Sequence, residues 1–265
     1  MSTGGVLMSY SAEVTIIIPN YKTPELTRLC LRSLRKYTDC SRIKVLVVDN
    51  DSADESLEYL RKLKWITLLE RTTAGENGPE MHAKALDMAM AYVDTPYVMV
   101  IHTDTIVLNN RWLDFMLKCI RKNDNIGGVG SWKLESVSPL KVFFKRIETR
   151  IRGMIGRKIL DREHYFRSHC ALYRSDAVRA TNGFYDGESA GVSLFAMLKE
   201  QNWELPFIQS EELSSYMAHL NHATMILNPR PGDRKTAKVS AVRKLRDKLR
   251  CLNSEDILRD DSLDI

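Results

Sequence analysis

Apolar, β-branched runs alternate with helix-like segments over the first half of the chain, and this alternation constrains the fold most. The run VTIIIP at 14–19 predicts a strand, and PELTRLCLRSLRKY at 24–37 follows it with leucines at near-helical spacing. The pattern recurs with KVLVVDN at 44–50 and YVMVI at 97–101. Such alternation predicts an α/β fold with a mostly parallel twisted sheet flanked by helices, whose ligands bind beyond the carboxyl ends of the strands.

Length and composition indicate one principal domain, because 265 residues with 44% hydrophobic content can bury one sizeable core. The five cysteines are scattered without a CxxC pair, which favours a reducing cytoplasm and argues against a thiolate zinc site. No apolar run reaches the roughly 18 residues that cross a bilayer, and the first residues lack the features of a signal peptide. We expect a cytoplasmic protein, soluble or peripheral on a membrane surface.

Two late segments carry much of the basic charge. PLKVFFKRIETRIRGMIGRKIL at 139–160 has one apolar stripe between lysines and arginines, which fits either an interfacial helix or a core-packed helix with a solvated basic face. Residues 234–250 hold eight Lys or Arg and one acidic residue, which fits an anionic membrane, a dimer-forming helix or a solvated face. The acidic end NSEDILRDDSLDI at 253–265 is expected to be frayed or disordered.

Polar residues stand at the ends of the expected strands. His102 and Asp104 are two positions apart, so alternation along a strand places both on one face, where they suit a divalent cation or form an ordinary polar strand end. Asp49 suits a ribose or base contact, but it also suits the turn before a helix that Ser52 would cap. No glycine-rich phosphate loop is present, so a bound phosphate would need a metal ion, Arg or Lys.

Four segments taken in order resemble family 2 nucleotide-sugar glycosyltransferases of the A-type fold. They are VTIIIPNYKTPELTRLCLRSLRKYT, KVLVVDNDSADESLEYL, HAKALDMAMAYVDTPYVMVIHTDTIVLNNRWLDFML and the pair NGFYDG with GVSLFAMLKEQNWELPFI. The resemblance is strong over 14–131 and weaker over 167–224. It does not extend to the basic insertion or to the C-terminal tail.

The resemblance implies a glycosyltransferase catalytic domain over 12–228. Its nucleotide-sugar-binding half would be 12–131 and its acceptor half 166–228, with the basic amphipathic insertion at 137–165 between them. Residues 229–265 would form a C-terminal basic helix and an acidic tail.

The resemblance also assigns roles to individual residues. The family's metal motif, aspartate-x-aspartate, falls on His102, Thr103 and Asp104, so a histidine replaces its first carboxylate. A late family histidine corresponds to His219 or His222 and would complete a site for Mn²⁺ or Mg²⁺. The residues expected to contact the nucleotide or the diphosphate of the donor are Pro19, Asn20, Tyr21, Asp49, His82, Lys84, Thr103 and Asp104.

The family's general base is usually an acidic residue in a turn before a late helix, where this chain has Ser-Ala-Gly. Glu188 is the first candidate and Asp186 the second. The resemblance implies inverting, metal-assisted transfer of a sugar from a nucleotide diphosphate donor to a glycan or lipid-linked acceptor. The donor nucleotide expected from the family is UDP, and the expected pathway is surface polysaccharide or glycolipid assembly. The implied partners are the donor and the acceptor, without nucleic acid, and an anionic membrane surface or a second copy of the chain is a further candidate.

Two other readings remain open at this stage. The histidine in the metal motif and the missing acidic turn also fit a catalytically silent, membrane-associated nucleotide-sugar-binding subunit. A sugar nucleotidyltransferase shares the sheet, but the chain lacks the glycine-rich loop with Arg and Lys that this class carries after its first strand.

Overall fold

The computed structural model describes residues 12–132, 165–181, 183–184, 189–220, 223–228, 235–252 and 254–265. Nearly all of the basic insertion expected at 137–165 lies outside these ranges. The two base candidates Asp186 and Glu188, and the metal candidate His222, also lie outside the described residues.

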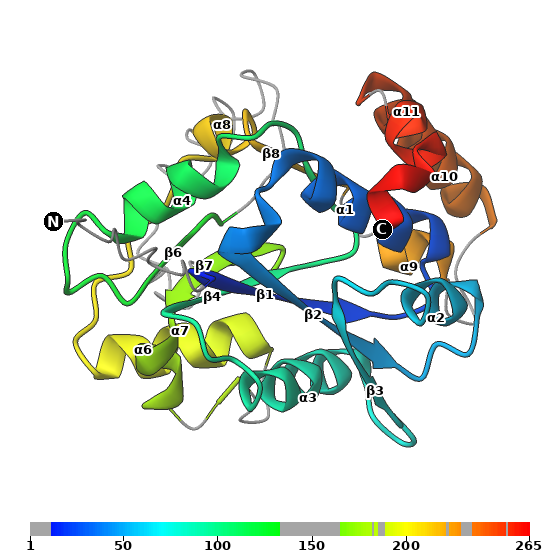
Figure 1. The fold of residues 1–265 in the computed structure, drawn as a ribbon. Helices are drawn as coiled ribbons and strands as arrows, with labels where there is room; N and C mark the ends of the chain where they lie inside the picture. Colours follow the sequence, from blue (N-terminus) through cyan, green and yellow to red (C-terminus); the bar gives the residue numbers. More distant parts are fainter. Residues whose placement is uncertain are drawn as a thin grey trace, which may run out of the picture.

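A six-stranded sheet forms the centre of the domain, in the order β3-β2-β1-β4-β7-β6 (Figure 1). The strands β1 to β4 run parallel to one another, whereas β7 pairs antiparallel with both β4 and β6. The predicted mostly parallel sheet is therefore confirmed. The strands span β1 Val14–Asn20, β2 Ile43–Asn50, β3 Thr67–Arg71, β4 Tyr97–Ile101, β6 Gly128–Gly130 and β7 Cys170–Arg174.

Helices cover both faces of this sheet, because successive side chains of a strand point to opposite sides. In β1, Ile16 and Ile18 pack with α1, α2 and α4, whereas Ile17 packs on the other face with α3, α6 and α7. Figure 1 shows the two helical layers on either side of the strands. The helices span α1 Pro24–Tyr37, α2 Glu55–Leu60, α3 Gly78–Met90, α4 Trp112–Ile120, α6 Ser175–Arg179 and α7 Ala190–Glu200.

One local prediction was wrong, and one apolar segment lacks regular structure. Asp54, not Ser52, caps α2 by accepting from the amide of Ser56 at 3.0 Å, because the Ser52 hydroxyl instead contacts Asn20. The apolar segment ELPFI forms only isolated bridges, from Glu204 to Ile126 and from Phe207 to Gly130. It runs along the edge of β6 without becoming a regular strand.

A second, two-stranded sheet sits beside the carboxyl end of β4. It pairs β5 (Thr105–Val107) with β8 (Met217–His219) in antiparallel register, so that Thr105 lies opposite His219. The short helices α8 (Ser210–Leu213) and α9 (Ala223–Leu227) flank β8 in the sequence. This pairing brings the late part of the chain back to the strand ends of the first half.

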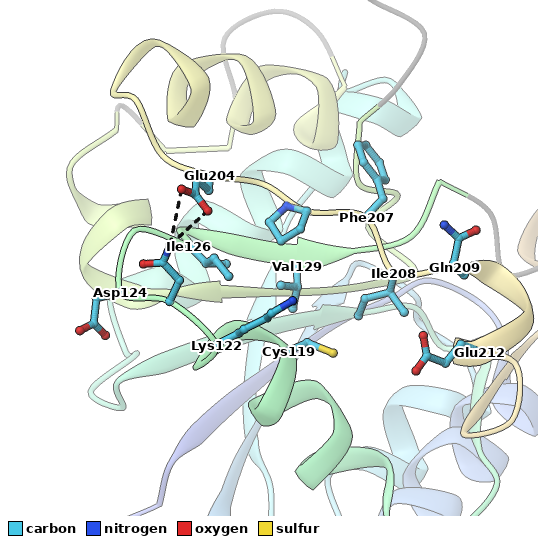
Figure 2. Close-up of a pocket in the computed structure, with 12 residues that line it drawn as sticks. Cys119, Lys122, Asp124, Ile126, Val129, Glu204, Phe207, Ile208, Gln209 and Glu212 are labelled. Carbon is cyan, nitrogen blue, oxygen red and sulfur yellow. Dashed lines mark hydrogen bonds between the residues drawn. The ribbon is translucent and has the colours of Figure 1, made fainter.

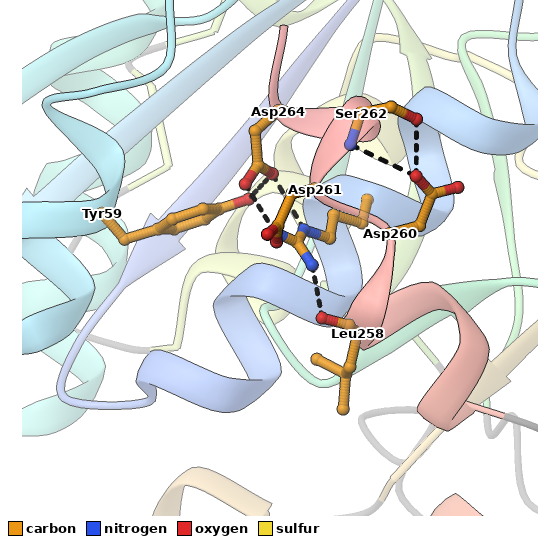
Figure 3. Close-up of polar contacts among 7 residues, drawn as sticks. Tyr59, Leu258, Asp260, Asp261, Ser262 and Asp264 are labelled. Carbon is orange, nitrogen blue, oxygen red and sulfur yellow. Dashed lines mark hydrogen bonds and ion pairs between the residues drawn. The ribbon is translucent and has the colours of Figure 1, made fainter.

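The acidic C-terminus is ordered, contrary to the expectation of a frayed tail. It forms α11 (Ser254–Arg259) and the 3-10 turn η3 (Asp261–Asp264), both packed on α1. The cause is Arg32 of α1, whose side chain is only 2% exposed and binds Asp261 and Asp264 (Figure 3). A buried guanidinium needs carboxylate partners, and the acidic tail supplies them.

The basic helix α10 (Lys235–Cys251) packs against α9 and α11. Its Leu245 is buried in an apolar cluster with Leu26, Leu29 and Ile257, whereas Val239 is 72% exposed. The apolar side chains of this helix are thus only partly buried against the domain. Charged side chains cover the outside of the helix, namely Arg243, Lys244, Arg246, Asp247, Lys248 and Arg250. Within the described part of the chain, no helix has both the length and the apolar character needed to cross a bilayer.

Candidate functional site

Three metal-capable side chains converge just beyond the carboxyl end of β4. The ligand atoms of His102, Asp104 and His219 all lie within 4.8 Å of one another. The β5–β8 pairing explains the convergence, because the amide of Leu220 donates to the Asp104 carbonyl at 2.9 Å and thereby holds His219 beside that residue. Thr103, between the two motif residues, points elsewhere and its hydroxyl contacts that of Thr23 at 3.0 Å.

Asp104 is the anionic centre of this cluster. One carboxylate oxygen, Oδ1, lies 3.1 Å from His219 Nε2 and 3.8 Å from His102 Nδ1, and the other accepts from the amide of Ala223 at 3.2 Å. Burial raises the pKa of Asp104, but the hydrogen bond from His219, the charges of both histidines and the Ala223 amide together hold it well below its ordinary value. The carboxylate is therefore ionised although it is only 3% exposed.

His102 is oriented by a residue from the segment that precedes β7. Its Nε2 lies 2.9 Å from the hydroxyl of Ser168, so its Nδ1 is the nitrogen that faces Asp104. The thiol of Cys30 donates to the His102 carbonyl from α1, and the ring of His82 packs edge-on against the His102 ring at 5.0 Å between centroids. Ser168 and His82 thus hold the His102 ring, and Cys30 of α1 holds its backbone.

His169 belongs to the cluster although sequence reasoning missed it. Its ring stacks on that of His219, with centroids 4.4 Å apart and planes 21° apart, and its carbonyl accepts from Thr105 at 2.8 Å. Burial, with further contributions from the neighbouring histidines, holds the pKa of His169 well below its ordinary value, so this ring is neutral. His169 reaches the cluster because Cys170 pairs antiparallel with Ile101, a strand direction that the parallel alternation of the sequence does not predict.

The residues assigned to the nucleotide base form a buried network where β1 and β2 end. Asn20 donates from Nδ2 to Asp49 at 2.7 Å and to Ser56 at 2.9 Å, and it accepts from Thr27. Asp49 is 1% exposed and its second oxygen accepts from the amide of Ser52. Pro19 and Tyr21 are partly exposed beside this network. Direct contacts from these residues to a base remain predictions.

Backbone strain gathers at the same strand ends. Lys22, Asp51 and Ala53 have φ values of 50°, 59° and 48°, in the left-handed region that favours glycine. Lys22 follows β1, and the other two follow β2. Strained backbone that persists in non-glycine residues often marks a binding loop, which agrees with the position of these loops beyond the sheet.

The two donor-side candidates of α3 lie in different surroundings. His82 borders the metal-capable cluster through His102, and burial lowers its pKa to about 3, so it is neutral. Its Nε2 is buried and makes no hydrogen bond to any residue that the structure describes. Lys84 instead shares its ammonium between Glu80, at 2.7 Å, and Glu76, at 3.3 Å. Neither arrangement tests a contact to the diphosphate.

A family model described as Glycosyl transferase family 2 matches residues 15–181, which is more than half of the chain. The chain belongs to glycosyl transferase family 2. It is therefore a glycosyltransferase by family, and its central sheet is the predicted A-type fold. No curated protein sequence matches the chain significantly.

Two solved structures support the fold. The mannosyltransferase PcManGT from Pyrobaculum calidifontis, in complex with GDP-Man and Mn²⁺, has a TM-score of 0.55 and 16% identity, over 93% of this chain and 76% of its own. Residues 1–349 of S. aureus TarS give a TM-score of 0.53 and 18% identity, over 89% of this chain and 71% of that one. At such identities the likeness concerns the fold alone.

The donor set of this glycosyltransferase fits a divalent cation. Asp104 supplies an ionised oxygen at the centre, and His102 and His219 supply nitrogens directed at it from two sides. A carboxylate with two imidazoles suits transition-metal ions, which accept both nitrogen and oxygen ligands. His222, the other histidine assigned by sequence, lies outside the described residues.

Two aromatic rings hold a cationic side chain, Arg167, just before the cluster residues Ser168 and His169 in the sequence. The Arg167 guanidinium packs over the rings of Trp132, at 4.6 Å, and Tyr165, at 4.7 Å, and donates to the Tyr165 hydroxyl at 2.6 Å. Among the described residues no acidic side chain forms an ion pair with it. Its neighbours in the chain, Ser168 and His169, belong to the histidine cluster, so Arg167 directly precedes that cluster in the sequence while its guanidinium is held by the two aromatic rings.

Described residues precede and follow the positions of the two base candidates. The amide of Phe184 donates to Asp87 at 2.6 Å, and α7 begins at Ala190. Gly191 packs so closely that a Cβ there would lie 2.7 Å from the carbonyl of Phe166. The start of α7 therefore lies against the segment that leads into Ser168 and His169.

A groove of about 720 Å³ lies along the β6 edge (Figure 2). None of the cluster residues lines it. Its walls come from the end of α4 and from residues 204–212, including Cys119, Lys122 and Phe207. It provides residues for control substitutions away from the histidine cluster.

Proposed function

We propose that this protein transfers a sugar from a nucleotide diphosphate donor to a hydroxyl of a glycan or lipid-linked acceptor, with inversion at the anomeric carbon. The observation that carries the proposal is the convergence of His102, Asp104 and His219 at the carboxyl edge of a family 2 sheet. This is where ligands bind in open α/β sheets. The proposed donor nucleotide is UDP, and GDP is the alternative because the PcManGT structure contains GDP-Man.

Charge explains how the donor would be held. The chain lacks a glycine-rich loop for phosphates, so a diphosphate requires a cation at this edge. Asp104, His102 and His219 would hold the divalent ion, which supplies positive charge to the departing diphosphate when bound. Arg167, kept in place by Trp132 and Tyr165, would add a second positive charge to the same region.

The transfer step needs a base on the acceptor side. The acceptor oxygen forms a bond to the anomeric carbon while its proton passes to a carboxylate, and the bond from that carbon to the diphosphate oxygen breaks with its electron pair. Glu188 is the proposed base and Asp186 the second candidate. The contact of Gly191 with Phe166 supports this choice, because it brings the start of α7 to the segment that carries His169.

The acceptor is proposed to belong to surface polysaccharide or glycolipid assembly at an anionic membrane. The exposed basic residues of α10 support electrostatic contact, since each is worth about 1 kcal/mol near an anionic leaflet. Because Leu245 is buried in the domain, contact would come from charge and not from insertion of the helix. Sedimentation with vesicles of pure neutral or mixed anionic lipid tests this, and equal binding to both would contradict it.

Donor hydrolysis and donor binding with Mn²⁺ test the enzymatic proposal. UDP-, GDP- and dTDP-sugars are compared for the unchanged protein, Asp104→Ala, Glu188→Gln and Asp186→Asn, with Lys122→Ala in the β6 groove as the matched control. We expect Asp104→Ala to lose metal-dependent donor binding. Glu188→Gln should keep binding and lose about 10²- to 10⁴-fold in turnover, the usual contribution of a general base.

The outcomes separate the alternatives. Binding of a donor without turnover by the unchanged protein would favour the silent nucleotide-sugar-binding subunit. Full metal-dependent donor binding by Asp104→Ala would refute the metal assignment. Loss of turnover in Asp186→Asn with normal turnover in Glu188→Gln would move the base to Asp186.

A further inference from the structure

We propose that His102 makes the metal site of this glycosyltransferase selective for divalent ions that accept imidazole ligands, such as Mn²⁺, Co²⁺ and Zn²⁺, and that the site discriminates against Mg²⁺. The inference rests on the metal-assisted function proposed above and specifies which ion that site takes. It starts from the substitution of a histidine for the first carboxylate of the family motif.

The structure prepares His102 as a ligand. Its Nε2 is engaged by the Ser168 hydroxyl at 2.9 Å, and a proton donated along this contact leaves the lone pair of Nδ1 directed toward Asp104. Metal-binding histidines usually have their second nitrogen held in this way by a neighbouring acceptor, which fixes the tautomer and the ring orientation. A histidine that only completed a polar strand end would not need its far nitrogen fixed and its near nitrogen turned to a carboxylate.

The spacing of the ligand atoms fits a single ion. Asp104 Oδ1 lies 3.8 Å from His102 Nδ1 and 3.1 Å from His219 Nε2. Two atoms bound to one ion at about 2.1 Å are separated by about 3.0 Å in octahedral and about 3.4 Å in tetrahedral geometry. Small side-chain rotations therefore suffice to bring all three atoms onto one ion, with positions left for a diphosphate.

Two further imidazole rings flank the cluster. His169 stacks on His219, and His82 packs edge-on against His102. The pocket is therefore rich in imidazole and has only one carboxylate, Asp104, in the cluster that the structure describes.

The chemistry of the three ligand atoms determines which ion the site prefers. Mg²⁺ prefers oxygen ligands in near-ideal octahedral geometry and gives up its water reluctantly. Imidazole binds Mn²⁺, Co²⁺ and Zn²⁺ progressively better, in the order of the Irving–Williams series. Two imidazoles and one carboxylate favour the later ions, whereas an aspartate at position 102 would restore a site with two carboxylates that accepts Mg²⁺.

Direct metal titration of the full-length, chelator-stripped protein tests the proposal independently of activity. Calorimetry with MnCl₂, CoCl₂, ZnCl₂ and MgCl₂ gives dissociation constants for the unchanged protein, His102→Asp and the groove control Lys122→Ala. We expect the unchanged protein and the control to bind Co²⁺ at least about 100-fold more tightly than Mg²⁺. In His102→Asp that ratio should fall by about tenfold or more, because a nitrogen ligand has become an oxygen ligand.

A second measurement protects the test against a variant that fails to fold. Electron spin-echo spectra of the unchanged Mn²⁺ protein should show nitrogen couplings from two imidazoles, and coupling from only one would overturn the role of His102. An unchanged Co²⁺ to Mg²⁺ ratio in folded His102→Asp would also overturn it, while metal-dependent transfer would still stand. Failure of every ion to bind, in both proteins, would remove the metal from the proposed function itself.

Discussion

The salt bridge between Arg32 and the C-terminal turn provides a quantitative test of how the tail is held. Asp264 receives two parallel hydrogen bonds from the Arg32 guanidinium, at 2.9 and 2.5 Å, and a third from the Tyr59 hydroxyl at 2.7 Å. Asp261 contacts the same guanidinium at 2.5 Å, but its side chain is 90% exposed, against 25% for Asp264. Figure 3 shows both carboxylates around the guanidinium.

These contacts set the size of the expected effects. Asp264→Asn removes the charge that faces a guanidinium only 2% exposed, while Asp261 and the Leu258 carbonyl still contact it. Hydrogen bonds to charged groups contribute about 1.5–3 kcal/mol, so we expect a loss of about 2 kcal/mol in the free energy of unfolding. Asp261→Asn should cost at most about 0.5 kcal/mol, because exposed ion pairs contribute little.

Thermal and urea unfolding of Asp264→Asn and Asp261→Asn measure these two losses in the free energy of unfolding. For a protein of this size a loss of 2 kcal/mol corresponds to a decrease of about 4–8 °C in Tm. Limited proteolysis near residue 253 should accelerate in Asp264→Asn alone, which would show that the tail detaches. Equal losses in the two variants, or a loss below about 0.5 kcal/mol in Asp264→Asn, would refute the claim that burial of Arg32 makes this contact strong.

Two further predictions concern acid stability and packing. Burial raises the pKa of Asp264, but the hydrogen bonds from Arg32 and Tyr59 outweigh this effect, so the pKa in the folded protein is lowered. Ionised Asp264 therefore contributes its full stabilisation of the folded protein above about pH 4, and this contribution is lost as the pH falls through the folded-state pKa. The stability gap between the unchanged protein and Asp264→Asn should therefore shrink below about pH 4 in urea titrations, and a constant gap would contradict this. Gly191→Ala should lower the free energy of unfolding by about 1–3 kcal/mol, because the added Cβ would lie 2.7 Å from the backbone carbonyl of Phe166. A Tm within about 1 °C of that of the unchanged protein would show that the backbone moves to accommodate the methyl group.

The parallel half of the fold was predictable because each element carries its own periodicity. Buried β-branched runs such as 14–19 and amphipathic helices such as 24–37 need no distant information, so the strand ends could be located from the sequence. His102 and Asp104 were placed on one face for the same reason. The structure brings both into one cluster while Thr103 turns to Thr23, but β4 ends at Ile101, so a turn after the strand and not strand alternation places them.

The remainder depended on pairings that local patterns do not encode. His169 joins the cluster only because β7 runs antiparallel to β4, and the sequence showed no feature that fixes this direction. The acidic tail looked like a solvated segment, because its partner Arg32 is more than 200 residues away in the sequence. Ser52 occupies a position typical of a helix cap, yet its hydroxyl accepts a hydrogen bond from the side-chain amide of Asn20.

The contact between Trp132 and Tyr165 brings two distant positions of the described chain to one point. The two rings meet edge to face, with centroids 5.4 Å apart. Because closure entropy grows only slowly with loop length, a change in the number of residues between positions 132 and 165 should cost little stability. Arg167, which packs on both rings, and His169 would keep their places, so one ligand cluster can serve chains that differ in length here, in nature or in an engineered enzyme.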